Sequence, residues 1–135
     1  MDPALVEFLQ PHVEKLKVWL VAEDGYGGWL DSFFRENGKY FDAFQEEHAL
    51  HYKTLHVEFA AKFEAEIQGW LRDEGMTEDH LVAMFQLGRL SGDPETEAVI
   101  DTMLEVMDYN KWIQHIFEVK KRIAARKFVR VRRAA

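Results

Sequence analysis

The chain has 135 residues, a formal net charge of −7 and no cysteine. Its length is typical of one domain, and its 47% hydrophobic content supplies enough apolar side chains for a core, which excludes a disordered chain. The lack of cysteine excludes disulfides, thiolate metal sites and a cysteine nucleophile, and it favours a reducing, cytoplasmic location. The sequence shows no run of 18 apolar residues, no signal-peptide pattern and no lipidation motif, so we expect neither a transmembrane segment nor a lipid anchor.

The first predicted helix opens at Asp2-Pro3, a cap followed by a first-turn proline, and extends to about Ala22. Pro11 is expected to interrupt or restart it. The glycine-rich stretch 24–28 predicts a turn, and a short helix follows from about Trp29 to Asn37, where Asn37-Gly38 is a natural stop.

The longest predicted helix covers about 46–73 and ends at Gly75. Its apolar residues are three or four positions apart, so they project from one side of the helix. The residues of this stripe are Tyr52, Leu55, Phe59, Phe63, Ile67 and Trp70. So wide a stripe must be covered, either by the rest of the chain or, in part, by another molecule.

Three further helices are predicted after residue 76, each with a start signal. The first follows Thr77 and breaks near 88–92, the second opens at Asp93-Pro94 with Val99, Ile100, Met103, Leu104 and Met107 inward, and the third covers about 109–126. Six helices with short connections predict an all-α fold, a single six-helix bundle with one long central helix. We expect the helical domain to cover residues 1–127 and a basic C-terminal tail to cover 128–135.

Charge is distributed unevenly along the chain. Residues 120–135 hold eight basic residues and no acid, whereas residues 1–119 hold 9 basic and 24 acidic residues, a net charge of −15. The basic end could bind nucleic acid or an anionic membrane, or it could be a charged helix end that suits the helix dipole. Alternation over 128–132 hints at a short extended segment.

No catalytic or metal-binding pattern is present. None of the six histidines has Glu three positions before it, the spacing used in di-iron bundles, and HExxH is absent. Ser32 and Ser91 are not in a GxSxG elbow, and no phosphate-binding loop occurs. We therefore expect no enzyme activity, no cofactor and no metal, with exposed or hydrogen-bonding histidines as the alternative to ligands.

The run Glu46 to Phe59 resembles the motif of the BART (binder of Arf-like) family, roughly EExxLxYTxIHxEY. The motif positions are Glu46, Glu47, Leu50, Tyr52, Leu55, His56 and Glu58, of which Leu55 is a conservative replacement, as is Phe59. Lys53 stands where the family tends to have Thr, and Asp42 stands where an aromatic residue would align. The order and lengths of the predicted helices to about Arg126 also fit the family.

The resemblance implies a six-helix domain that acts as an effector of Arf-like small GTPases. Such a domain binds the GTP-loaded form and takes the N-terminal amphipathic helix of the GTPase into a hydrophobic groove; several members are linked to cilia and flagella. We expect the groove among the long helix and the last helices, and a monomeric protein. The candidate lining residues are Phe59, Phe63, Phe85, Leu104, Met107, Trp112 and Ile116, each of which could instead be core.

Three other readings stay open at this stage. The basic end could carry the function by binding nucleic acid or an anionic membrane. The bundle could be an enzyme after all, or it could be a structural adaptor or homodimer in which the apolar stripe pairs with its own copy.

Overall fold

A computed structural model describes the backbone of residues 1–134 and the side chains of residues 1–126. Its elements are α1 (Pro3–Val21), α2 (Tyr26–Asn37), the 3-10 turns η1 (Gly38–Phe41) and η2 (Glu46–His48), α3 (Ala49–Asp73), α4 (Glu78–Ser91), α5 (Pro94–Met107) and α6 (Tyr109–Ala134). Over these 134 residues the regular structure is helical and includes no strand. The all-α prediction is confirmed.

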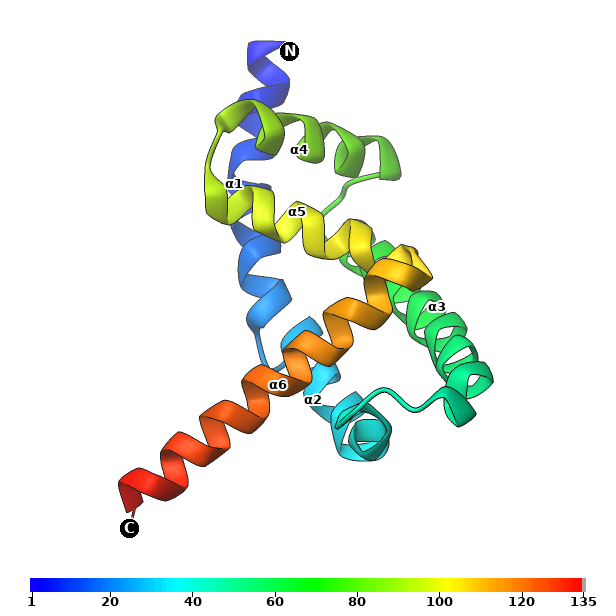
Figure 1. Cartoon of the computed structure of the whole chain (residues 1–135). Helices are drawn as coiled ribbons and strands as arrows, with labels where there is room; N and C mark the ends of the chain where they lie inside the picture. Colours follow the sequence, from blue (N-terminus) through cyan, green and yellow to red (C-terminus); the bar gives the residue numbers. More distant parts are fainter. Residues whose placement is uncertain (135) are drawn as a thin grey trace.

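The helices cross one another at steep angles. Figure 1 shows α4 and α5 crossing α1, while α3 lies on the other side of the molecule beside the end of α5 and the start of α6. The predicted helix over 46–73 is divided, because residues 46–48 form η2 and α3 begins at Ala49. Gly75 and Gly92, with φ angles of 70° and 67°, follow α3 and α4 in the left-handed conformation that glycine adopts at little cost.

Helix α1 continues through Pro11, so the prediction that this proline interrupts or restarts the helix is wrong. A proline inside a helix removes one backbone hydrogen bond. Leu9 and Leu16 lie on either side of it and are 0% and 3% exposed, so packing against the core holds both halves in place. The ring of His12 also donates from Nδ1 to the carbonyl oxygen of Phe8 at 2.9 Å. Tertiary contacts override the local propensity here.

Most of the predicted apolar stripe of α3 is buried in the core. The buried residues of α3 are Tyr52, Leu55, Phe59, Phe63, Ile67 and Leu71. Trp70, expected to complete the stripe, is only partly buried, and Leu71 takes its place. The ring of Phe59 packs on Trp29 of α2 and Trp112 of α6, with centroids 4.4 and 5.5 Å away. Aromatic contacts thus join three helices at one point of α3.

Aspartates begin the last two helices. Asp93 Oδ2 accepts hydrogen bonds from the amide and the hydroxyl of Thr96 at 3.3 and 2.6 Å, which caps α5. Lys17 of α1 lies 3.0 Å from the same carboxylate. The Thr96 and Lys17 contacts hold the pKa of Asp93 down at about 2. Asp108 caps α6 through the amide of Asn110, 3.0 Å from Oδ1, and is the single residue between α5 and α6.

Helix α6 extends beyond the body of the fold towards the C-terminus (Figure 1). Its backbone is helical to Ala134, so the hint of an extended segment over 128–132 is wrong. The expected boundary between the domain and the basic tail, at 127/128, falls inside this helix. The side chains from residue 127 on, and so those of the whole tail, lie outside the described side chains.

Candidate functional site

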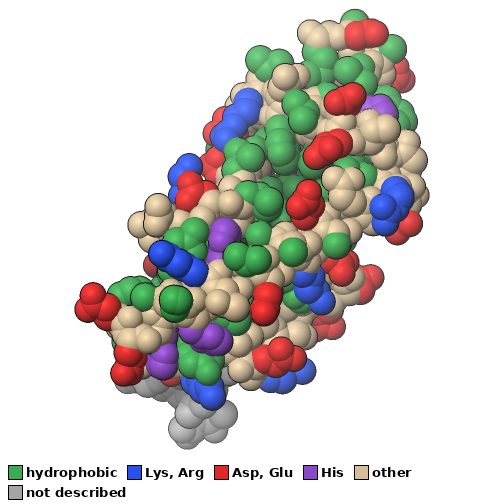
Figure 2. Space-filling model, turned by 90° about the vertical axis from the view of Figure 1, so that its right-hand side faces the viewer, with side chains coloured by type: hydrophobic (Ala, Val, Ile, Leu, Met, Phe, Trp, Pro, Cys, Tyr) green, Lys and Arg blue, Asp and Glu red, His purple; other side chains and the backbone are tan. Residues whose placement is uncertain are grey.

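An apolar groove opens where α3, α4 and α5 meet. We call it the α3–α4–α5 groove; its volume is about 160 Å³. Its lining residues are Phe63, Glu64, Ile67 and Gln68 of α3, Glu78, Leu81 and Phe85 of α4, and Met103, Leu104 and Met107 of α5. On the face of the molecule that holds α3, hydrophobic side chains gather in a hollowed patch with acidic side chains beside it (Figure 2).

The groove combines a buried floor with exposed walls. Phe63, Ile67 and Met103 are 3–4% exposed and form the floor. Leu104 and Met107 are 49% and 52% exposed, although both are large hydrophobic side chains that are normally favoured inside a protein. Exposed apolar side chains next to a hollow indicate a binding surface, because covering them with another apolar surface lowers the free energy.

Four of the seven residues expected to line a partner groove meet in this one place. Phe63, Phe85, Leu104 and Met107 come from three helices, and all four line the α3–α4–α5 groove. For Leu104 and Met107, however, the expectation that they point inward is wrong. Helix α5 turns Ile100, Met103 and Val106 into the core, which leaves these two side chains at the surface.

The other three expected lining residues belong to the core. Phe59 is 2% exposed, and Trp112 and Ile116 are 0% exposed. Phe59 and Trp112 pack on each other in the aromatic cluster at the middle of α3, away from the groove. In this conformation they offer no surface to a partner.

Sequence reasoning did not assign three polar groove residues, Glu64, Gln68 and Glu78. They lie at the rim, and among the described side chains the groove lining holds two acids and no Lys, Arg or His. In the sequence, Glu64 directly follows Phe63 and Gln68 directly follows Ile67. These polar positions beside the buried stripe of α3 are the pattern from which the groove rim could have been predicted. Ile67, Met103 and Leu81 also line the groove. The sequence predicts an inward position for Ile67 and Met103, but it does not single out any of the three as a lining residue.

Two residues of the expected family motif anchor α3. Tyr52 is fully buried; its hydroxyl donates to the carbonyl oxygen of Tyr40 at 2.7 Å and accepts from the amide of Gln45 at 3.2 Å. His56 donates from Nε2 to the carbonyl oxygen of Val106 at 2.8 Å. These bonds attach α3 to the segment before it and to the end of α5, so these two positions have a structural role.

The remaining motif residues divide between core and surface. Leu55 is 7% exposed and belongs to the core, whereas Leu50 is 70% exposed. Glu46, Glu47 and Glu58 are also exposed. None of these residues lines the α3–α4–α5 groove.

Neither a metal cluster nor a membrane span is found in the described part of the chain. No group of three or more His, Cys, Asp or Glu residues there could hold a metal ion. No described helix combines the length and the apolar character needed to cross a membrane.

Comparison with protein-family models agrees with the motif. Comparison with curated proteins and with solved structures finds no match to the chain. Residues 14–125, however, match the sequence model of the family described as the ARF-like 2 binding protein BART. This match includes every helix that contributes to the α3–α4–α5 groove, most of α6 and the C-terminal part of α1. Because it spans most of the 135 residues, the chain belongs to the BART family.

Proposed function

We propose that this chain is a non-enzymatic binding module, an effector of an Arf-like small GTPase in its GTP-bound form. In this proposal the N-terminal amphipathic helix of the GTPase enters the α3–α4–α5 groove. The family description, an ARF-like 2 binding protein, supports the class of partner. The observation that carries the proposal is the groove itself, where the half-exposed side chains of Leu104 and Met107 stand over a buried apolar floor.

The shape and composition of the groove suit one face of an amphipathic helix. Such a helix presents apolar side chains three or four positions apart, and it binds by placing them in a hydrophobic groove. Three helices form the walls of this groove, so successive apolar side chains of a partner helix can each contact an apolar wall. Met103 and Met107 add unbranched side chains that adapt to the shape of a partner.

The acidic rim favours a partner helix with a basic polar face. Glu64 and Glu78 are exposed at the groove edge. The first 119 residues carry a net charge of −15, so the domain as a whole also attracts a basic surface. Charge pairs at such a rim contribute to the association rate and to specificity more than to affinity.

Titration with a panel of Arf-like GTPases tests the proposal. Each GTPase is loaded with a GTP analogue or with GDP, and each is also prepared without its N-terminal helix. We expect one or more members to bind tightly only in the GTP-analogue form and only with the helix present. Equal affinity for both nucleotide forms, or unchanged affinity after removal of the helix, contradicts the proposal.

We further propose that the domain is a single six-helix bundle built around α3, and that it acts as a monomer. Contacts of α3 with α4, α5 and α6 support this arrangement. Sedimentation equilibrium then gives one species with the mass of one chain, 15.9 kDa. In cells we expect the protein in the cytoplasm, with enrichment at a cilium or flagellum where one is present; imaging of the tagged chain checks this.

A second candidate function is binding of nucleic acid or an anionic membrane through residues 120–135. The observation that favours it is the continuation of α6 to Ala134 over a stretch with eight basic residues and no acid. Removal of residues 127–135, which hold four of the eight basic residues, then weakens salt-dependent binding to RNA, DNA or anionic vesicles. The GTPase proposal instead expects no change in GTPase binding from the same deletion.

A further inference from the structure

A second cavity lies on the opposite side of α5 from the α3–α4–α5 groove, between α1, α2, α5 and α6. We call it the α1–α2–α5–α6 cavity; its volume is about 430 Å³, within the range of about 300–1,000 Å³ that is usual for small-molecule sites. Its apolar lining residues are Val18, Leu20, Val21, Leu30, Ala98, Val99 and Val119. Its opening leads to solvent past Val18 and Val21, which are 64% and 80% exposed.

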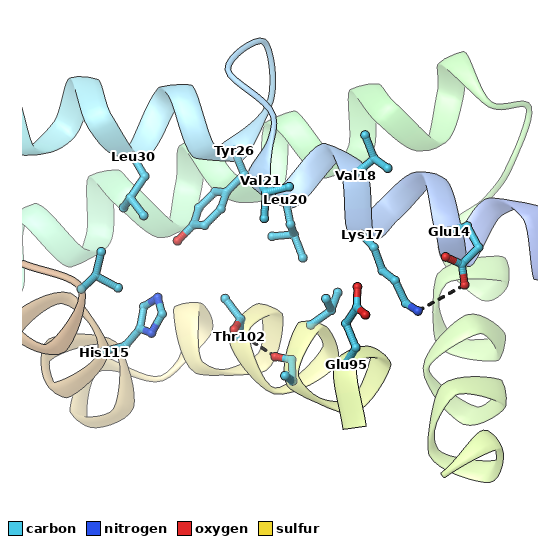
Figure 3. A pocket seen from close by; sticks show the side chains of 13 residues that line it. Glu14, Lys17, Val18, Leu20, Val21, Tyr26, Leu30, Glu95, Thr102 and His115 are labelled. Carbon is cyan, nitrogen blue, oxygen red and sulfur yellow. Dashed lines mark hydrogen bonds and ion pairs between the residues drawn. The ribbon is translucent and has the colours of Figure 1, made fainter. Parts of the chain in front are cut away.

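Two buried polar atoms at one end of this cavity have no hydrogen-bond partner. They are the hydroxyl oxygen of Tyr26 and Nε2 of His115. Figure 3 shows the two side chains reaching towards each other across the cavity, Tyr26 from α2 and His115 from α6. Buried polar groups are nearly always paired, and an unpaired one costs free energy. An orphaned pair that faces an open apolar space is what a ligand with a polar group would satisfy.

The surroundings of the pair define which hydrogen bonds it offers. Glu105 Oε2 lies 3.5 Å from Nδ1 of His115 and favours the proton on that nitrogen, which leaves Nε2 as an acceptor. Burial lowers the pKa of His115, so the ring is neutral at physiological pH. Burial also raises the pKa of Tyr26, so its hydroxyl keeps its proton and can donate. One donor and one acceptor therefore face the cavity.

Charge around the cavity disfavours an ionised ligand. Glu14 and Glu95 line the opposite end (Figure 3). Glu105 lies beside His115, with Oε2 3.5 Å from Nδ1. The one lysine there, Lys17, is already paired with Asp93 at 3.0 Å and with Glu14 at 3.2 Å. A ligand carboxylate would lie near acidic side chains and would find no free cation among the described lining residues. A ligand ammonium group would have to pair with Glu14 or Glu95, away from the end that holds Tyr26 and His115.

We propose that the α1–α2–α5–α6 cavity binds an uncharged apolar small molecule that carries one hydroxyl group, placed between the Tyr26 hydroxyl and Nε2 of His115. The ligand hydroxyl donates to Nε2 and accepts from Tyr26, so both orphaned atoms gain a partner. The hydrocarbon part lies against the valines and leucines of the four helices. This site is separate from the α3–α4–α5 groove, and its occupation does not depend on a GTPase.

Two isomeric probes test the hydroxyl requirement. 1-Octanol has a hydroxyl that donates and accepts, whereas dibutyl ether has the same atoms and a similar apolar content but only accepts. NMR titration of the methyl-labelled full chain reports the place of binding, since Val99 and Val119 line this cavity and Leu81 and Leu104 line the other. We expect saturable shifts at Val99 and Val119 with 1-octanol, and an affinity for dibutyl ether lower by about threefold to tenfold.

Variants separate the two hydrogen bonds. His115→Phe removes the acceptor, so we expect the affinity for 1-octanol to fall by about threefold to tenfold. The variant then no longer binds 1-octanol more tightly than dibutyl ether. Tyr26→Phe removes the hydroxyl that donates to the oxygen of either probe and keeps the ring in place, so we expect the affinity for both probes to fall. His48→Phe, at a histidine that does not line the cavity, leaves both affinities unchanged.

Several results would overturn the proposal. They are the absence of saturable shifts with 1-octanol, equal binding of dibutyl ether by the unmodified protein, and shifts confined to Leu81 and Leu104. A crystal soaked in 1-octanol that shows only water between Tyr26 and His115 would do the same. Failure of GTPase binding leaves these results unaffected, so the two proposals fail separately.

Discussion

The side chain of His56 on α3 donates a hydrogen bond from Nε2 to the carbonyl oxygen of Val106, 2.8 Å away in the last turn of α5. The last carbonyls of a helix have no partner within the helix and must find one elsewhere. His56 supplies that partner, and its ring also packs on Trp112, with centroids 5.1 Å apart. One side chain thus joins α3, α5 and α6 close to the Asp108 connection, and it helps to set the position of Leu104 and Met107 over the groove.

The substitution His56→Phe therefore lowers stability. It leaves the Val106 carbonyl without its donor, and we expect the free energy of unfolding to fall by about 1–3 kcal/mol in urea denaturation. His51→Phe is the matched control on the same helix. Nε2 of His51 is buried without a partner, and its ring packs on Tyr40, a contact that Phe keeps, so we expect no loss. Equal losses from the two substitutions would show that the hydrogen bond is not the cause.

Much of this arrangement follows from the sequence, but the partner of His56 does not. The spacing of apolar residues on α3 correctly predicts Tyr52, Leu55, Phe59, Phe63 and Ile67 as one buried face. The acceptor of the His56 bond is a backbone carbonyl, which every residue has, so no sequence pattern identifies it. Spacing shows that a face is apolar, but it does not show which neighbour covers it.

The same limit explains how the candidate lining residues divided. Two series of residues on α5 have helical spacing: Ile100, Met103 and Met107, and Thr96, Ile100 and Met103. Only packing against α1, α3 and α6 decides which series faces inward. In the structure this packing buries Val106 and leaves Met107 exposed. For Trp112 and Ile116 the sequence correctly indicates an apolar face of α6, but both side chains are completely buried in the core, where Phe59 packs on Trp112.

Stability depends on pH through Asp93. Its pKa is about 2 in the folded protein and 3.8 without structure, so the folded state prefers the ionised carboxylate. The contribution of Asp93 is complete above about pH 4 and is lost as the pH falls towards about 2. Asp93→Asn keeps an amide that can cap α5 but removes the charge that faces Lys17. We expect the stability difference between the two proteins to shrink over this pH range. A difference that stays constant from pH 7 to pH 2 would contradict the assignment.

Two glycine substitutions should change stability in opposite directions. A Cβ at Gly88 of α4 would come within 2.4 Å of Cδ1 of Ile100 and 2.8 Å of Cγ2 of Thr96, so Gly88→Ala displaces these two buried side chains of α5 and costs about 1–3 kcal/mol. At Gly69 of α3 the nearest atom would be 3.9 Å away on Arg72, so Gly69→Ala only favours the helix, by about 0.5–1 kcal/mol. Thermal unfolding of both variants checks the signs. A stabilising Gly88→Ala would contradict the close packing of α4 on α5.

The central claim is that the α3–α4–α5 groove takes an amphipathic helix of an Arf-like GTPase. Leu104→Glu places a charge in the groove wall, whereas Leu90→Glu makes the same change at a leucine of α4 that is 75% exposed and does not line this groove. Both residues are exposed, so we expect both variants to keep the fold, and circular dichroism checks this.

The most direct test is the affinity of these two variants for the GTP-analogue form of the partner GTPase, measured by calorimetry. The account predicts that Leu104→Glu weakens binding by at least about tenfold, because the charge must lose its water when the apolar face of the partner covers it. It predicts that Leu90→Glu binds like the unmodified protein. Equal affinity of the two variants, or a larger loss for Leu90→Glu, would show that the partner binds elsewhere.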